Sequence, residues 1–346
     1  MSGLVLLTGA TGAFGRCIAR ELLERGCELV LLVRGSSEIE ATCRVLAALD
    51  TRDASRSVTV LHGDISLPGL GLEPRAANVL RSTLDGIVHA AATTAFGSPL
   101  ADARRVNVGG TCNVLDFAQT VDGLRSVGYV STTFVAGRRV GTIAESELVH
   151  GEGFVTTYEQ SKYEAELLVR AAAEAIPLTI FRPSVIVGGE TAGKPSALFF
   201  VLSMIRRGLL PILPAGRHTR LDLIDARDAA AAFATLLAGA DGGGTYHLAS
   251  GTEAPLVSEV VRAAGAPQVR FVDEDAFAGE LRWLRRAEPR AATLYERLAK
   301  FIGILAYPKI FDTSAAAAAL NGPVRHADPL AGIRAAFAPD EQESAA

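Results

Sequence analysis

The chain has 346 residues, of which 49% are hydrophobic and 21% are charged, and its formal net charge is −4. This length allows a large buried core, arranged as one large domain or as a core with a smaller cap. The weak negative charge gives no field that would attract a nucleic acid, so we expect no nucleic-acid partner. The apolar segments are too short to span a bilayer, and the N-terminus lacks a basic segment followed by a cleavable apolar region. These features predict a cytoplasmic protein without a membrane span.

The four cysteines are Cys17, Cys27, Cys43 and Cys112. They lack the paired spacing that is typical of metal sites. We therefore expect no bound metal, and we expect buried free thiols in a reducing compartment.

A glycine-rich turn lies near the start of the chain. An apolar run at 4–7 precedes it, and apolar residues recur at helical spacing over 16–23. Its glycines allow a tight turn, the close approach of a pyrophosphate and close packing of the helix on the strand. The helix N-terminus offers free N–H donors to that phosphate. The expected cofactor-binding residues of this turn are Gly9, Thr11, Gly12, Ala13, Phe14 and Gly15.

Further apolar runs alternate with helical segments along the chain. We expect strands at 28–33, 57–61, 86–89, 126–130, 178–181 and 245–248. This alternation predicts an α/β fold with a doubly wound parallel sheet of the Rossmann type. We predict an NADP-binding core over residues 1–188 and a smaller, mostly helical substrate cap over 189–346, of which about 220–250 returns to the core.

Arg34 follows the second predicted strand. An acidic residue at this place would bind the adenosine ribose of NAD, whereas an arginine accommodates the 2′-phosphate of NADP. Arg34 therefore favours NADP, and Arg44 in the following helix is a second candidate. The alternative is that Arg34 is a surface arginine at a strand end.

The ends of later strands provide further candidate cofactor contacts. After the third strand, a carboxylate and the next backbone group would border the adenine, or would form only a turn. Small residues after the fourth strand let the cofactor lie close to the sheet. Backbone groups after the sixth strand would contact the nicotinamide carboxamide, or would form a simple turn. These residues are Asp64, Ile65, Ala90, Ala91, Ala92, Pro183, Ser184 and Val185.

Tyr158 and Lys162 lie four residues apart in a predicted helix over about 158–174. Their side chains therefore share one face of that helix. The hydroxyls at 131–133 follow the fifth predicted strand and reach the same edge of the sheet. Together with the glycine turn, these groups indicate reduction with a nicotinamide cofactor. The alternatives are an ordinary pair on a surface helix and a polar strand end.

The glycine turn, Asn107, the hydroxyls at 131–133 and the Tyr158–Lys162 pair resemble the extended short-chain dehydrogenase/reductase superfamily. The chain is most similar to the branch of fatty acyl-CoA reductases and the thioester reductase domains of carboxylic acid reductases and peptide or polyketide synthases. The segments that carry this narrower match are Gly63–Ser66, His89–Ala92, Val106–Thr111, Tyr129–Thr132 and Arg182–Gly188. The resemblance covers roughly the first 240 residues.

The resemblance implies a role for each of these residues. Tyr158 would protonate the carbonyl oxygen, and Lys162 would make the phenol a better acid and hold the nicotinamide ribose. Thr132 would hydrogen-bond the substrate oxygen, with Ser131 and Thr133 as less favoured hydroxyls. Asn107 would bend its helix or relay a proton beside the cofactor.

The resemblance also implies an NADPH-dependent oxidoreductase that reduces an acyl thioester, carried by coenzyme A or by an acyl-carrier protein, to an aldehyde and in a second step to an alcohol. The same side chains serve any carbonyl, so a ketone or aldehyde reductase, an alcohol dehydrogenase and an NDP-sugar epimerase remain alternatives. An NADP-binding sensor is the non-enzymatic alternative, against which the intact Tyr158 and Lys162 argue. The apolar segment 198–205 would line an acyl tunnel or form ordinary cap core. The sequence leaves the oligomeric state open.

Overall fold

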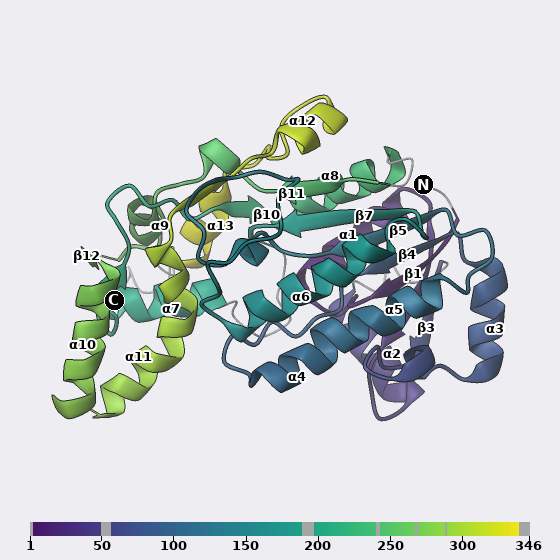
Figure 1. Ribbon diagram of the computed structural model, residues 1–346, viewed down its shortest axis with the longest axis horizontal. Coiled ribbons are helices and arrows are strands. Elements are labelled where there is room, and N and C mark those ends of the chain that lie inside the picture. The colour runs from purple at the N-terminus through teal and green to yellow at the C-terminus, as the bar shows by residue number, and fades with distance from the viewer. Residues whose placement is uncertain are drawn as a thin grey trace, which may run out of the picture.

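A parallel seven-stranded sheet forms the centre of the protein (Figure 1). The computed structural model describes residues 3–49, 57–188, 197–239, 243–266, 269–287 and 289–338. The strand order across the sheet is β11-β7-β5-β4-β1-β2-β3. Its strands are β1 (Leu4–Thr8), β2 (Glu28–Val33), β3 (Val58–His62), β4 (Gly86–His89), β5 (Ser126–Val130), β7 (Leu178–Pro183) and β11 (Thr245–Leu248). The predicted doubly wound α/β fold is confirmed.

The direction of winding reverses between β1 and β4. From β1 the chain continues outward through β2 and β3, and it then returns to β4 on the other side of β1. In parallel sheets of this kind, ligands bind in the crevice beside the carboxyl ends of the strands at such a switch point. The fold therefore places the glycine turn after β1 directly beside the small residues after β4.

Helices cover both faces of the sheet because side chains alternate along each strand. Leu6 packs with residues of α3, α5 and α6 on one face, and Leu7 packs with residues of α1, α2 and α8 on the other. The helices of the first face are α3 (Pro74–Thr83), α5 (Gly110–Ala118) and α6 (Thr157–Ala172). Those of the second face are α1 (Ala13–Glu24), α2 (Glu38–Ala48) and α8 (Ala226–Gly239).

The long helix expected over about 100–121 is interrupted in the structure. It consists of α4 (Leu100–Arg104), a π-helical turn over Arg105–Gly109, and α5. A π-helical turn inserts an extra residue and changes the direction of the side chains around it. Asn107 lies in this turn, and its side chain is buried.

A second hydrophobic core lies beyond the carboxyl ends of the strands, on the left in Figure 1. Its helices are α7 (Ala197–Arg206), α9 (Val257–Ala263), α10 (Glu274–Ala287), α11 (Pro289–Ile302) and α13 (Pro329–Ala336). The division into a core at 1–188 and a cap at 189–346 stays a prediction, and residues 189–196 at its boundary lie outside the described ranges. Within 220–250, β11 pairs with β7 of the main sheet.

Three short parallel strand pairs and a short helix lie outside the main sheet. The pairs are β6 (Gly141–Ile143) with β13 (Lys309–Phe311), β8 (Val185–Val187) with β10 (Leu223–Asp225), and β9 (Ile212–Pro214) with β12 (Arg270–Val272). The helix is α12 (Ser314–Leu320). Strands of three residues are too short to show a hydrophobic period, so the sequence did not predict these pairs.

The prediction of buried thiols is only partly right. Cys27 is buried and Cys17 is half-buried, but Cys43 and Cys112 are exposed. Cys43 lies on the outer face of α2 and Cys112 on the outer face of α5, where a small apolar residue needs no packing partner. Within the described ranges, no helix has the length and apolar content needed to cross a membrane.

Candidate active site

The glycine turn after β1 forms a cradle that leaves no room for a side chain. Gly9 has a φ of +82°, and a Cβ there would lie 2.5 Å from the backbone nitrogen of Ala91. At Gly15 a Cβ would lie 2.1 Å from the carbonyl oxygen of Gly9. Gly12 caps α1 without a side-chain hydrogen bond, so the N–H groups of the first turn face the crevice uncapped. The cradle fits the pyrophosphate of a dinucleotide.

Other residues of the predicted glycine turn differ in exposure. Gly12 and Ala13 are exposed, and Thr11 is half-buried. Phe14 instead points into the core, where its ring packs edge-on against Phe233 at 6.3 Å. Phe14 therefore supports the cradle by packing.

The predicted adenine end lies at the carboxyl ends of β2 and β3. Arg34 and Arg44 are both exposed there, and the Arg44 guanidinium donates a hydrogen bond to the Arg34 carbonyl oxygen. Burial acts to raise the pKa of Asp64, but two hydrogen bonds from Ser66 and the charge of Arg34 outweigh it, so the pKa lies below its usual value. The Ile65 carbonyl oxygen accepts a hydrogen bond from Asn113 at 2.7 Å, and this contact fixes the loop beneath the crevice.

Tyr158 and Thr132 meet at the same edge of the sheet. Thr156 caps α6 in a capping box with Glu159, which fixes where the helix starts and hence where Tyr158 points. Both Tyr158 and Thr132 are buried, and the Thr132 hydroxyl lies near enough to the phenol to act on its pKa. Burial raises the pKa of Tyr158 to about 12, although the Thr132 hydroxyl acts in the opposite direction. The structure thus brings together the predicted acid and the favoured hydroxyl.

Lys162 is buried behind this pair. Its Nζ donates to the phenolic oxygen of Tyr129 at 2.7 Å and to the carbonyl oxygen of Val130 at 2.8 Å. Burial lowers the Lys162 pKa to about 7, although the carboxylate of Glu166 acts in the opposite direction. An ammonium has three N–H donors, so one remains for a ligand. Tyr129 was not predicted to be the partner of this lysine.

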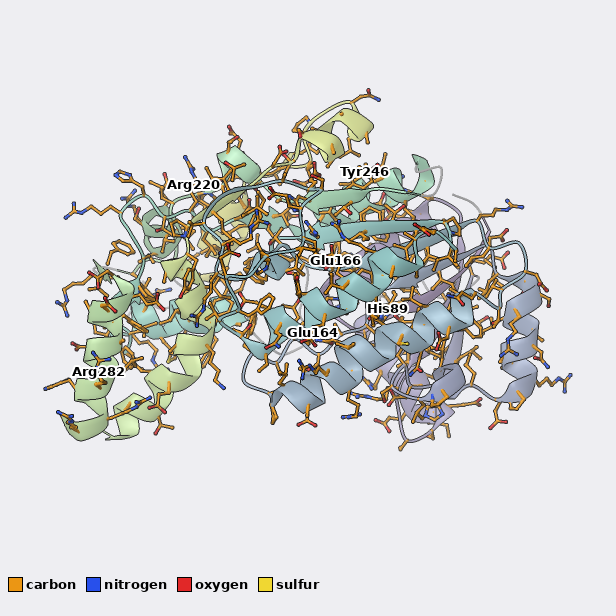
Figure 2. The ribbon with its side chains drawn as sticks, in the orientation of Figure 1. His89, Glu164, Glu166, Arg220, Tyr246 and Arg282 are labelled. Atoms are coloured by element: carbon orange, nitrogen blue, oxygen red, sulfur yellow. The ribbon has the colours of Figure 1, made fainter. Side chains whose placement is uncertain are left out.

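A chain of buried hydrogen bonds runs from Thr111, close to Tyr129, to β1. The Thr111 hydroxyl lies 3.1 Å from His89 Nε2, and His89 Nδ1 lies 2.8 Å from the Thr8 hydroxyl. His89, labelled in Figure 2, is buried. Burial, with the charge of Lys162, lowers the His89 pKa to about 3, so the ring is neutral at pH 7.

The direction of each bond in this chain follows from the donors available. Thr111 donates its only proton to the carbonyl oxygen of Asn107 at 2.6 Å. It must therefore accept from His89 Nε2, which leaves His89 Nδ1 to accept from Thr8. Thr8 in turn accepts from the backbone N–H of Ala91 at 3.2 Å. The hydroxyl donors of Thr8 and Thr111 are both used, so the chain holds the crevice edge in one fixed arrangement.

Asn107 links the loop after β4 to α6. Its Oδ1 accepts from the backbone N–H of Thr93, and its Nδ2 donates to the carbonyl oxygen of Thr93 and to the hydroxyl of Ser161. Both amide protons are therefore committed. Of the two predicted roles, this arrangement favours shaping of the helix over relay of a proton.

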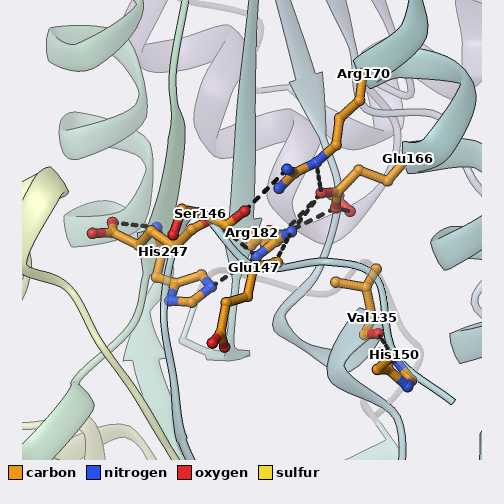
Figure 3. A network of polar contacts seen from close by, with 10 residues as sticks. Val135, Ser146, Glu147, His150, Glu166, Arg170, Arg182 and His247 are labelled. Atoms are coloured by element: carbon orange, nitrogen blue, oxygen red, sulfur yellow. Dashed lines mark hydrogen bonds and ion pairs between the residues drawn. The ribbon is translucent and has the colours of Figure 1, made fainter.

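A buried ion pair lies one helical turn beyond Lys162 (Figure 3). The Glu166 carboxylate accepts from Arg182 at 2.6 Å and from the hydroxyl of Ser131 at 2.6 Å, and neither charged side chain is more than 1% exposed. Arg182 also donates to His247 and to the carbonyl oxygens of Glu145 and Glu147. Ser131 is thus used for structure, which leaves Thr132 as the hydroxyl that reaches Tyr158. Glu166 was not predicted, although its spacing of four residues from Lys162 was visible.

The predicted nicotinamide end follows β7. The N–H of Ser184 donates to the carbonyl oxygen of Leu248, and the N–H of Val185 donates to that of Asp222. Pro183 has no N–H. These backbone donors are therefore already used, and contact with a carboxamide would have to involve other atoms of this segment.

An apolar crevice lies between α7, α9 and the end of α11, and its cavity volume is about 30 Å³. Four residues of the predicted acyl segment line it, namely Leu198, Val201, Leu202 and Ile205. Phe96 joins this crevice to the site, because its ring lies 5.2 Å from that of Tyr158 and 5.3 Å from that of Phe301, which lines the crevice. The same residues are buried members of the second core, so the segment is cap core, and its role in lining an acyl tunnel stays a prediction.

The described ranges contain no cluster of His, Cys, Asp and Glu suited to hold a metal ion. The site is thus built from a dinucleotide cradle, a phenol with a threonine hydroxyl near it, and a buried ammonium.

Residues 7–232 match an NAD-binding family described as male sterility protein. The chain belongs to this family. Within the short-chain dehydrogenase/reductase superfamily, the male sterility family includes the reductases described next, so the resemblance seen in the sequence is confirmed.

Two curated relatives are reductases by name. The chain is 28% identical over 221 residues to the fatty acyl-CoA reductase wat of Drosophila melanogaster, covering 53% of this chain and 43% of that protein. It is 31% identical over 281 residues to the carboxylic acid reductase of Segniliparus rugosus, covering 70% of this chain and 23% of that protein. The chain thus spans less than half the length of either relative.

A solved structure extends the similarity to almost the whole chain. The terminal R domain from the myxalamid PKS-NRPS biosynthetic pathway is 26% identical and has a TM-score of 0.79. The match covers 97% of this chain and 90% of that domain. The second core is therefore part of the shared fold.

Proposed function

We propose that this member of the male sterility family is an NADPH-dependent reductase of an acyl thioester. The observation that carries the proposal is the contact of Phe96 with Tyr158 on one side and with Phe301 of the apolar crevice on the other. A phenol beside a threonine hydroxyl can act on a carbonyl oxygen, and the apolar lining of the adjoining crevice suits an alkyl chain. The named activities of the relatives agree with this substrate class.

The cofactor assignment rests on the cradle and on two arginines. A Cβ at Gly9 or Gly15 would clash with neighbouring backbone, so these glycines keep the turn tight, and the uncapped start of α1 provides N–H donors for a pyrophosphate. Arg34 and Arg44 would hold the 2′-phosphate of NADP, with Asp64 and Ile65 beside the adenine and Ala90, Ala91 and Ala92 beneath the ring system. When bound, NADPH supplies the hydride that adds to the carbonyl carbon.

The residues of the chain provide the proton chemistry. Thr132 donates a hydrogen bond to the carbonyl oxygen, and Tyr158 gives that oxygen its proton as the tetrahedral hemithioacetal forms. Lys162 holds the nicotinamide ribose with its third N–H and stabilises the resulting phenolate by its charge. The hemithioacetal then returns the proton to Tyr158 while its C–S bond breaks, and the sulfur leaves as a thiol after taking a proton from solvent. The products are an aldehyde, a thiol and NADP⁺, and a second reduction gives the alcohol.

The thiol can belong to coenzyme A or to the arm of an acyl-carrier protein. One structural neighbour with 25% identity and a TM-score of 0.70 is the reductase domain of a nonribosomal peptide synthetase from Mycobacterium tuberculosis. We propose an acyl-carrier protein as a candidate partner on this basis.

The test measures NADPH consumption with hexanoyl-CoA and with hexanal, and it measures epimer formation from UDP-glucose, because epimerisation consumes no NADPH. We expect consumption with hexanoyl-CoA, with one free thiol released per NADPH for the aldehyde product or per two NADPH for the alcohol. Consumption with hexanal alone would assign the protein to simple carbonyl reduction and would overturn the thioester proposal. NADPH binding without turnover of any of the three substrates would favour the sensor instead.

A further inference from the structure

A second hollow adjoins the apolar crevice, and its cavity volume is about 30 Å³. We call it the polar pocket, and it is lined by Thr133, Arg220, Asp222, Tyr307, Lys309 and Phe311. It shares Phe134, Leu221, Ile304 and Leu305 with the apolar crevice. Thr133 directly follows Thr132 in the chain, so the pocket begins one residue from the proposed contact to the substrate oxygen. Figure 2 labels Arg220 where the second core meets the sheet.

Lys309 contributes a cation with unused donors to the polar pocket. Its Nζ donates to the carbonyl oxygen of Tyr307 at 2.9 Å, which is its single acceptor within the described part of the chain. Burial lowers the Lys309 pKa to about 8, while the carboxylate of Glu159 favours the charged form. At pH 7 the side chain is therefore mostly an ammonium, with N–H groups left over for an incoming oxygen.

Thr133 contributes a second unused donor. Its side chain is 1% exposed, and among the described residues its hydroxyl has no hydrogen-bond partner. A buried hydroxyl without a partner costs about 1–3 kcal/mol, so native proteins rarely keep one without a reason. A ligand oxygen in the pocket would remove this cost.

Two further charged groups line the pocket. Asp222 accepts hydrogen bonds from the backbone N–H groups of Ser250 and Gly251, both at 2.8 Å. Arg220 donates one of its five N–H groups to the carbonyl oxygen of Ala254, so donors also remain on its guanidinium. Glu159, outside the lining, accepts from the N–H groups of Val155 and Thr156 through Oε2, and among the described residues its Oε1 has no hydrogen-bond partner. The donors that face a ligand are therefore those of Lys309, Thr133 and Arg220.

We infer that the polar pocket binds an oxygen substituent on the acyl chain, close to the thioester carbonyl, through Lys309 and Thr133. This inference rests on the proposed thioester reduction and specifies its substrate class. The hydrocarbon part of the chain lies in the apolar crevice, and a hydroxyl or oxo oxygen near its thioester end lies in the polar pocket. The natural substrate is accordingly an oxygenated acyl thioester.

The experiment compares hexanoyl-CoA with 3-hydroxyhexanoyl-CoA, which differ by one oxygen. It measures kcat/KM with NADPH and, separately, the calorimetric Kd without NADPH. A hydrogen bond from a charged donor corresponds to a preference of about tenfold or more for the hydroxylated chain in both measurements. We expect Lys309→Met and Thr133→Val each to reduce this ratio toward one. Lys300→Met, which removes an exposed lysine of α11, should leave the ratio unchanged.

Each outcome has one meaning. A wild-type ratio near one in both measurements overturns the inference even if both thioesters are reduced. Equal loss for both substrates in Lys309→Met also overturns it, because the pocket would then hold the pantetheine arm or serve only stability. A calorimetric preference that depends on Lys309, without any NADPH consumption, supports the pocket and instead refutes the proposed reduction. Thermal unfolding of both variants checks that they are folded. If Lys309→Met does not fold, Thr133→Val provides the test.

Discussion

The ammonium of Lys162 lies 2.7 Å from the phenolic oxygen of Tyr129, close to Thr111, at which the hydrogen-bond chain to Thr8 begins. The lone pairs of the phenolic oxygen accept from the ammonium. An acceptor for the charged form counteracts the burial that lowers the Lys162 pKa to about 7. Tyr129 therefore positions Lys162 and tunes its charge.

Replacement of Tyr129 by phenylalanine removes this acceptor and keeps the ring, whose centroid lies 4.3 Å from Nζ. The Lys162 pKa should fall further, by about one unit. If the reaction needs the ammonium, kcat/KM falls as the pH rises through this pKa, and the midpoint moves to lower pH in Tyr129→Phe. The measurement is kcat/KM from pH 5 to 9. Tyr163→Phe, next to Lys162 in α6, is the control. Identical midpoints in both variants would refute the role of Tyr129.

Substitution of two glycines that have the same φ distinguishes the cost of backbone strain from the effect of the cradle's shape on cofactor binding. Gly9 and Gly26 both have φ of +82°, but a Cβ at Gly26 would meet no atom within 4 Å. Gly26→Ala should cost about 1–2 kcal/mol from the backbone alone and leave NADPH binding intact. Gly9→Ala should in addition abolish NADPH binding, measured by fluorescence titration. Equal affinity in the two variants would show that the cradle does not hold the cofactor.

The buried ion pair predicts a large loss of stability when one partner is removed. Arg182→Met leaves the Glu166 carboxylate buried without its main partner, and this should cost about 3–5 kcal/mol of unfolding free energy. Arg104 pairs with Glu164 on the exposed side of the same helix at 2.6 Å, and Arg104→Met should cost less than about 1 kcal/mol. Urea denaturation measures both. A small loss in Arg182→Met would contradict the view that this pair holds α6 and β7 together.

Arg34 is expected to discriminate between the two nicotinamide cofactors. Arg34→Ala should raise the Kd for NADPH about tenfold, which corresponds to the loss of one charge-assisted contact, and should change the Kd for NADH little. Arg75→Ala, at an exposed position of α3, is the matched control. A similar loss for both cofactors would remove Arg34 from the phosphate site.

The main sheet was predictable because each of its strands is an apolar run long enough to be recognised. The strands at 28–33, 86–89, 126–130 and 245–248 have the bounds that the sequence predicted. Parallel strands covered on both faces show this continuous pattern, whereas the three-residue pairs around the second core do not. The π-helical turn at Asn107 depends on contacts with Thr93 and Ser161, which no local pattern reveals.

The groups that face the crevice were also predictable, because glycines, Tyr158 and Lys162 occur at a spacing with a direct chemical meaning. The residues behind them were not. His89, Thr111 and Tyr129 come from three elements far apart in the chain, and only the sheet order brings them together. Lys309 lies 147 residues after Lys162 and reaches the site through a strand pair that the sequence does not show. The prediction that Lys162 acts on Tyr158 also lacked the information that Tyr129 and Val130 bind its ammonium.

The most direct test of the central claim is the rate of NADPH-dependent aldehyde formation from hexanoyl-CoA by the wild type and by Tyr158→Phe, with the NADPH Kd measured for both. The substitution removes the hydroxyl and keeps the ring that contacts Phe96. We expect the rate in Tyr158→Phe to be lower by about a hundredfold or more, because the general acid is lost. The Kd for NADPH should be unchanged. An unchanged rate of aldehyde formation would contradict the central claim.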